Sequence, residues 1–188
     1  IGNYNGSWDK LFSKSIKVLR KFSQFLLITD GDTSILDSLK GKVKVLVQRC
    51  LWHIPYQAKY VLWQDGVKHK SAEWLQVMSE LMEICAIRPL VDCEKTIKKM
   101  IESKRKRLES VIQYCLSKGY PHTASYLENA MPDMFTAIEK RLKGKTTSKV
   151  ERVMRTINMR VNVSKWSIAG ALNVTKIRLA YYYNGFDA

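Results

Sequence analysis

The chain has 188 residues, of which 32 are Lys or Arg and 17 are Asp or Glu, so its formal net charge is +15. This length is sufficient for one domain with a hydrophobic core of its own. No apolar stretch approaches the ~20 residues that a membrane-spanning helix needs, and the N-terminus lacks the pattern of a secretory signal, so the sequence predicts a soluble protein. The excess of positive charge favours a polyanionic partner, either nucleic acid or an anionic membrane surface, with a solvated basic surface and no partner as the alternative.

The first predicted element is an amphipathic helix over residues 8–22, with a basic outer face. The apolar run at residues 25–29 ends at Asp30-Gly31, which is typical of a strand buried on both faces. A short helix is predicted over residues 33–40 and a second strand over residues 43–47. This succession predicts a parallel βαβ unit with Asp30 at the carboxyl end of its first strand, where open α/β sheets place their ligands.

From Cys50 onward the periodicity is helical. Helices are predicted over residues 50–64, 71–87, 89–118, 121–142 and 148–161, with a terminal helix from about residue 165. Pro132 is expected to break one of them or to begin a new one. The predicted fold class is therefore α/β and mostly helical, with a large all-α stretch after the βαβ unit.

The helix predicted over residues 89–118 has a basic face opposite an apolar stripe. Its basic residues are Lys95, Lys98, Lys99, Lys104, Arg105, Lys106 and Arg107. Taken alone, this pattern is typical of a solvated face, whereas beside a site that cuts phosphodiesters it favours contact with the DNA backbone. Cys85, Cys93 and Cys115 fall among apolar helical positions and are predicted to be small core residues.

Asp30 is a candidate metal ligand. Phosphoryl transfer between DNA strands uses divalent cations held about 3.5 to 4 Å apart by carboxylates, and Mg²⁺ prefers oxygen ligands. A strand end gives such a carboxylate a rigid position, and Gly31 allows the chain to turn away sharply. Asp-Gly is also common in ordinary turns, and Asp32 is a candidate N-cap for the short helix that follows.

Glu151 has two interpretations. Ser148-x-x-Glu151 has the spacing of a capping box, in which the two side chains satisfy the first amides of a helix. In the helix that follows, however, Glu151, Arg155 and Asn158 line up beside an apolar stripe. A carboxylate, a guanidinium and an amide on one helical strip suit a metal and phosphate site.

Cys50 and His53 form a Cys-x-x-His element directly after the second predicted strand. This spacing suits half of a zinc site, although no second ligand pair is close in sequence. The favoured interpretation is that His53 bonds a phosphate or orients a carboxylate while Cys50 packs beneath it. The remaining alternative is a pair of core residues at the start of a helix.

In their joint order these motifs resemble those of Mutator-like DDE transposases of prokaryotic insertion sequences. In that family the second catalytic Asp follows a strand and precedes Gly, and a Cys-x-x-His element follows the next strand. A helical insertion then separates these motifs from the final Glu, which begins a helix written Glu-Arg with further Arg residues. The corresponding elements here are Asp30-Gly31, Cys50-Leu-Trp-His53 and Glu151-Arg152-Val-Met-Arg155, followed by Arg160.

The resemblance implies a partial ribonuclease H-like core in residues 1–66 and 144–188 and an all-α insertion in residues 67–143. It implies that Asp30 and Glu151 are metal carboxylates for Mg²⁺ or Mn²⁺, within roughly 4 to 8 Å of each other when no metal is bound. Cys50 and His53 would belong to the same catalytic site. The DNA-binding residues would be Arg152, Arg155, Arg160, Lys98, Lys99, Lys104, Arg105, Lys106 and Arg107.

The expected partners are the DNA of transposon ends and targets, with no membrane, a homo-oligomer in the full-length protein and a cytoplasmic, nucleoid-associated location. The family's first catalytic Asp would lie upstream of Ile1, so weak metal binding and no cleavage are expected of this chain alone. DNA binding should persist and fall steeply with salt. The alternatives are a noncatalytic basic helical module that binds nucleic acid and another ribonuclease H-like nuclease.

Overall fold

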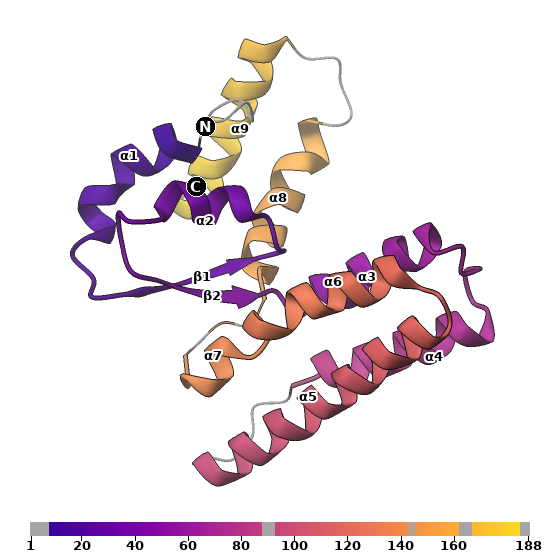
Figure 1. The fold of residues 1–188 in the computed structure, drawn as a ribbon. Helices are drawn as coiled ribbons and strands as arrows, with labels where there is room; N and C mark the ends of the chain where they lie inside the picture. The colour runs from indigo at the N-terminus through magenta and orange to yellow at the C-terminus, as the bar shows by residue number, and fades with distance from the viewer. Residues whose placement is uncertain (1–7, 88–92, 143, 145, 162–166, 185–188) are drawn as a thin grey trace. The chain divides into compact units, whose positions relative to one another are not determined.

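A computed structural model describes residues 8–87, 93–142, 144, 146–161 and 167–184 of the chain (Figure 1). Two compact units are present, Trp8–Thr146 and a second one that includes residues 147–161 and 167–184, and each is described by itself. The described residues are mostly helical and contain one small parallel sheet of two strands. The predicted class, α/β with a predominance of helix, is confirmed at this level.

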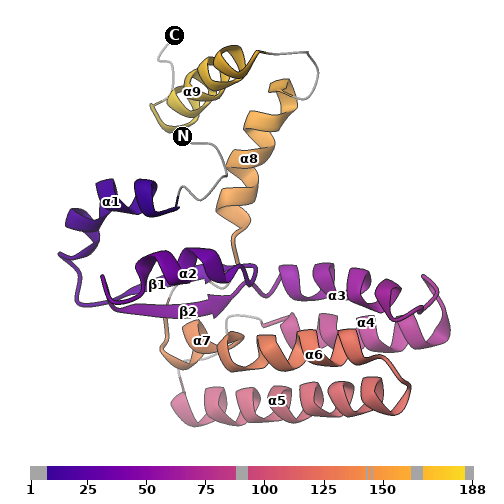
Figure 2. The same ribbon diagram turned by 45° about the horizontal axis from the view of Figure 1, so that its top comes forward.

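The first unit begins with helix α1 (Trp8–Leu19), strand β1 (Phe25–Thr29), helix α2 (Thr33–Leu39) and strand β2 (Val45–Arg49). The two strands pair in parallel, and α2 packs against α1 and crosses one face of the sheet (Figure 2). The predicted βαβ unit is thereby confirmed.

The second strand lies two residues later than residues 43–47. The register pairs Phe25 with Val45 and Thr29 with Arg49, so the ladder continues through Gln48 and Arg49. The prediction rested on the run of apolar residues, so it left out these two polar residues. Their side chains form hydrogen bonds with another part of the fold.

The prediction of a first strand buried on both faces is wrong for the described sheet. In β1 only Thr29 is buried, and the four apolar residues before it are half-buried. Side chains point to the two faces of a sheet, and in a sheet of two strands each has a neighbouring strand on one side only, so part of each apolar side chain stays accessible.

Four helices pack around one hydrophobic core in the rest of this unit. They are α3 (His53–Gln64), α4 (Ala72–Cys85), α5 (Glu94–Ser117) and α6 (Pro121–Ala130), and consecutive helices contact each other, as do α3 and α6. A helix is present in each predicted range, and at least one of its ends lies inside the predicted bounds. At the start of α3, for example, residues 50–52 form a turn in which the His53 amide donates to the Cys50 carbonyl at 3.0 Å.

The helix predicted over residues 121–142 is interrupted where Pro132 was expected to break it. A short 3₁₀ helix, η1 (Met131–Asp133), follows α6, and the four-residue helix α7 (Thr136–Glu139) contacts β2. Between β2 and residue 142, the part of the chain that the structure describes contains no strand, in agreement with the prediction for that stretch.

The second unit contains α8 (Ser148–Val161) and α9 (Ile168–Asn184), which pack against each other. Lys165 and Trp166, with which the terminal helix was predicted to begin, lie outside the described residues. None of the described helices combines the length and apolar character that crossing a bilayer requires.

Candidate functional site at the carboxyl end of the sheet

The motif residues Asp30 and Cys50 lie at the same edge of the sheet. The Cys50 amide donates to the Thr29 carbonyl at 2.8 Å, which extends the ladder one residue beyond β2. The exposed Asp30 carboxylate bends back over its turn, where Oδ1 accepts from the Thr29 hydroxyl and the Asp32 amide, both at 3.3 Å. The parallel βαβ unit therefore places Asp30 and the Cys-x-x-His element at one edge, as predicted from their positions after successive strands.

Gly31 is required at the turn by its conformation and by its neighbour. Its φ of +117° is one that L side chains rarely adopt, and a Cβ there would lie 1.7 Å from Nη1 of Arg49. The guanidinium thus crosses directly over the turn that carries Asp30.

Arg49 connects this turn to the far end of the helical stretch. Its side chain is 13% exposed, its Nε lies 3.3 Å from Oδ1 of Asp133, and Nη2 donates to the Asn129 carbonyl at 3.1 Å. Nη1 lies 3.4 Å from the Asp30 carbonyl. Sequence reasoning gave Arg49 no role, because its partners are 80 and 84 residues away and leave no local pattern.

Gln48 makes the companion connection beneath the sheet. It is fully buried, its Nε2 donates to the Met134 carbonyl at 2.5 Å, and its Oε1 accepts from the Ala137 amide at 2.8 Å. Buried amide groups are stable only when they are hydrogen-bonded, so Gln48 fixes the position of η1 and α7 against β2.

The Cys50-x-x-His53 element turns from the sheet into α3. Cys50 is fully buried, and His53 is half-buried as the first residue of the helix. The His53 ring meets two aromatic rings edge-on, Trp52 at 4.9 Å and Tyr56 at 6.2 Å between centroids. Among the residues that the structure describes, no group of three or more His, Cys, Asp or Glu side chains lies close enough together to hold a metal ion.

Tyr126, on α6, is a residue that the sequence did not single out. Its hydroxyl is buried and has no hydrogen-bond partner within the described part of the chain. Burial raises the pKa of Tyr126 to about 12, and the Arg49 charge opposes that shift, whereas Asp30 and Cys50 add to it. A buried, unsatisfied hydroxyl thus lies within electrostatic reach of the edge that carries the motifs.

Asp32 is the N-cap of α2, which confirms that interpretation. Its carboxylate accepts from the Ser34 amide at 2.9 Å, and the bonds from the Ser34 side chain and backbone lower the pKa of Asp32. Its neighbour Asp30, not Asp32, keeps an exposed carboxylate at the end of β1.

The predicted basic face of α5 is partly occupied by contacts within the chain. Basic residues of this face form three ion pairs: Lys98 with Glu94 at 3.1 Å, Arg105 with Glu139 at 2.8 Å and Arg107 with Glu80 at 2.8 Å. Because these pairs are at least partly exposed, they contribute little to stability, on the order of 0 to 1 kcal/mol each.

The remaining predicted side chains of α5 differ among themselves. Lys104 donates to the Glu83 carbonyl at 2.6 Å, and burial lowers its pKa, whereas Lys99 and Lys106 are exposed. Cys93 is exposed at the N-cap of α5, so its prediction as a core residue is wrong, while Cys115 is buried as predicted.

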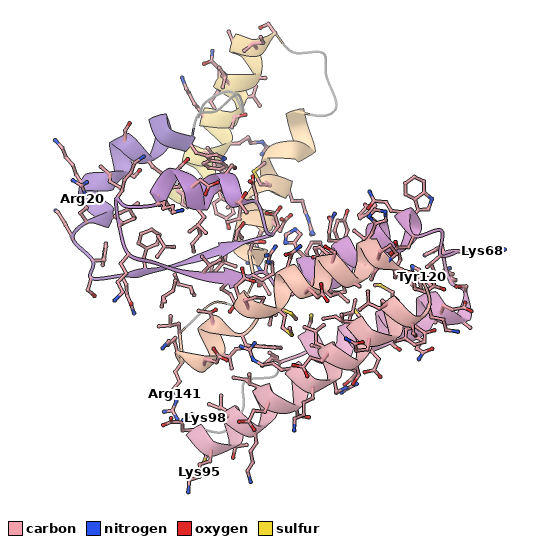
Figure 3. All side chains as sticks on the ribbon, viewed as in Figure 1. Arg20, Lys68, Lys95, Lys98, Tyr120 and Arg141 are labelled. Atoms are coloured by element: carbon pink, nitrogen blue, oxygen red, sulfur yellow. The ribbon has the colours of Figure 1, made fainter. Side chains whose placement is uncertain are left out.

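Basic side chains also gather at the N-terminal end of α5, where Figure 3 labels Lys95, Lys98 and Arg141 close together. An open cleft of about 440 Å³ lies there, lined by Lys98, Arg141 and neighbouring residues of α5 and α7. Glu94 and Glu139 line the same cleft, so its charge is mixed.

Glu151 lies in the first turns of α8. Its amide donates to the Thr147 carbonyl at 3.0 Å, so Thr147 is the N-cap of α8 and Ser148 is the first helical residue. In a capping box Ser148 itself would be the N-cap, so Ser148 lies one position too far into the helix for that motif. Glu151, Arg152 and Arg155 are exposed, and the side chains of Ser148 and Arg160 lie outside the described residues. Since Asp30 and Glu151 belong to different units, their separation stays a prediction.

No protein-family model, curated protein or solved structure matches the chain.

Proposed function

We propose that the chain is a catalytic part of a DDE-type transposase, which cleaves DNA strands and transfers them with the help of divalent cations. The observation that carries the proposal is the shared sheet edge, where Asp30-Gly31 and Cys50-x-x-His53 follow neighbouring parallel strands. Their order in the sequence resembles the Mutator-like pattern, and the edge position suits a site for phosphoryl transfer.

Connectivity supports the inclusion of Glu151 in this site. The backbone of Gly144 lies against β1, because a Cβ at Gly144 would meet Cδ1 of Ile28 at 2.9 Å. Seven residue steps lead from Gly144 to Glu151, and the last four of them are helical. A step of the chain spans at most about 3.5 Å and a helical step about 1.5 Å, so chain length limits the separation of the two Cα atoms to about 17 Å. The chain thus allows the carboxylate to reach the end of β1.

The residues fit a hard cation. Asp30 offers an exposed carboxylate on a turn that is fixed by hydrogen bonds, and Glu151 offers a second exposed carboxylate. Bound Mg²⁺ or Mn²⁺ would activate the attacking oxygen and stabilise the leaving oxygen. In this proposal His53 bonds a phosphate at the border of the site, and Arg152 and Arg155 bind the DNA backbone by charge-assisted hydrogen bonds.

A Mn²⁺ titration followed by electron paramagnetic resonance tests this assignment. We expect Asp30→Asn and Glu151→Gln each to weaken Mn²⁺ binding about tenfold, because each removes one charged oxygen ligand. The matched controls Asp37→Asn and Glu109→Gln change exposed carboxylates on α2 and α5 and should leave it within about twofold. If the controls and the site variants behave alike, the two carboxylates share no metal and the proposal fails.

The second candidate, a noncatalytic basic module that binds nucleic acid, is favoured by the net charge of +15 alone. Both candidates predict binding to duplex DNA that weakens steeply with salt. They differ in the Mn²⁺ titration, in which the noncatalytic module would show no loss in either site variant.

A further inference from the structure

We propose that the exposed face of α3 is a stacking platform for the unpaired bases of single-stranded DNA. The platform, here called the aromatic row, consists of Trp52 at the N-cap of α3 and Tyr56, Tyr60 and Trp63 within it, with Lys59 among them. The choice of DNA as the nucleic acid rests on the proposed function, whereas the stacking argument rests only on these side chains.

The aromatic row occupies one face of the helix, opposite the core. Positions 52, 56, 60 and 63 are spaced by three or four residues, so their side chains share a stripe. Ile54, Ala58 and Leu62 are fully buried on the other side. The stripe spans eleven residue steps, or about 16 Å at 1.5 Å per step, which is the length of about five bases stacked 3.4 Å apart.

The four rings expose much of their large apolar surface to solvent. Such exposure is unfavourable unless a partner covers the rings. The exposed fractions are 53% for Trp52, 41% for Tyr56, 46% for Tyr60 and 74% for Trp63. Contiguous exposed apolar surface of this kind marks an interaction site, and the described fold leaves this one uncovered.

Contacts between the side chains hold Trp52, Tyr56 and Tyr60 in place. Trp52 and Tyr56 stack with 5.1 Å between centroids and 16° between planes, and the Tyr56 and Tyr60 hydroxyls are 3.3 Å apart. Nζ of Lys59 lies 3.8 Å from the centroid of Tyr56 and 5.0 Å from that of Tyr60. Ordered rings lose little freedom when a base stacks on them, and the ammonium provides a cation for the phosphates.

The charge of this part of the sequence favours a polyanion over a protein partner. Residues 38–64 contain five Lys or Arg and no Asp or Glu, and one of the five, Lys59, lies over the rings of the row. The next acid, Asp65, accepts from the amides of His122 and Thr123 at 3.0 and 2.8 Å. Exposed Lys68 and Lys70 follow, and Figure 3 labels Lys68 at the edge of the unit. Aromatic rings interleaved with cations are the usual surface for single-stranded nucleic acid.

The aromatic row begins next to the proposed metal site. It begins at Trp52, one residue before His53 and three residues after β2 ends. A strand laid along the row would therefore lead to the sheet edge that carries Asp30.

Fluorescence anisotropy with three labelled probes tests the proposal. The probes are a twelve-nucleotide oligothymidine, a twelve-nucleotide abasic strand with the same phosphates and a twelve-base-pair duplex. We expect Trp63→Ala and Tyr60→Ala each to weaken oligothymidine binding about fivefold or more and to leave binding of the other two probes within about twofold. Trp63→Phe should restore most of the loss, because it restores a ring.

The matched control is Phe22→Ala, which removes an exposed aromatic ring (61% exposed) outside α3 and should not change binding of any probe. Unchanged oligothymidine binding in the α3 variants would overturn the proposal, as would equal losses for the oligothymidine and the abasic strand. Failure of the Mn²⁺ titration alone would leave stacking intact, so the two proposals fail separately.

Discussion

The turn at Gly31 makes a quantitative prediction for Gly31→Ala. The substitution places a methyl group at φ +117°, which costs about 1 to 3 kcal/mol in backbone strain. The methyl group would also lie 1.7 Å from Nη1 of Arg49 and would displace the guanidinium. Loss of the contacts of Arg49 with Asp133 and the Asn129 carbonyl costs about 1 to 2 kcal/mol more. We expect a total loss of about 2 to 5 kcal/mol in the free energy of unfolding.

A double-mutant cycle with Arg49→Ala separates the two contributions. Without the guanidinium, Gly31→Ala should cost only the backbone strain, so the cycle should give a coupling energy of about 1 to 2 kcal/mol. Urea unfolding of the four proteins, followed by tryptophan fluorescence and circular dichroism, measures it.

Gly66→Ala is the matched control. Gly66 also has a positive φ, +79°, but a Cβ there would have no neighbour within 4 Å. Its substitution should cost about 1 to 2 kcal/mol and should not couple to Arg49→Ala. The reasoning is refuted if the Gly31 cycle is additive within about 0.5 kcal/mol, or if the two glycine substitutions cost the same.

Three further predictions follow from individual contacts. Gln48→Leu should lower the free energy of unfolding by about 2 to 4 kcal/mol, because it leaves the buried Ala137 amide and Met134 carbonyl without a hydrogen-bond partner. The control Gln57→Leu, at an exposed position of α3, should change it by less than about 0.5 kcal/mol. Asp65→Ala should cost about 1 to 2 kcal/mol through loss of the bonds to the first turn of α6, measured by urea unfolding. Hydrogen bonds at the α5 N-terminus lower the pKa of Cys93, so at neutral pH Cys93 should hold more thiolate than Cys115 and react with iodoacetamide first. Burial raises the pKa of Cys115 to about 11, so Cys115 should react only on unfolding. Mass spectrometry of the labelled chain compares the two labelling rates, and equal rates would contradict the prediction.

The elements that the sequence predicted well are those with a local cause. The apolar run of β1 ends at a turn in which Gly31 has a positive φ. At the start of α4, the Ser71 side chain accepts a hydrogen bond from the Trp74 amide. Hydrophobic periodicity and capping residues act over a few positions, so they can be read without the fold.

The contacts that build the sheet edge could not be read in this way. Gln48 and Arg49 bond residues 80 to 89 positions away, and the buried hydroxyl of Tyr126 has no sequence signature at all. The prediction of Cys93 as a core residue failed for a related reason, since apolar spacing does not reveal that a helix begins at the next residue. Long-range side-chain contacts depend on packing between elements, and sequence periodicity describes only one element at a time.

In the proposed site, a long helical stretch of sequence separates Asp30 from Glu151. The stretch leaves the sheet at the end of β2, and it is bonded back to β2 by Gln48 and Arg49 at η1 and α7. The chain then passes β1 at Gly144, three residues before the N-cap of α8. The length of the helical stretch therefore does not limit whether Glu151 can reach Asp30, because the stretch begins and ends beside the sheet. If the two carboxylates share a metal ion, as we propose, lengthening the segment from Gly144 to Glu151 should disturb metal binding more than an insertion of the same size in the exposed loop at Lys68.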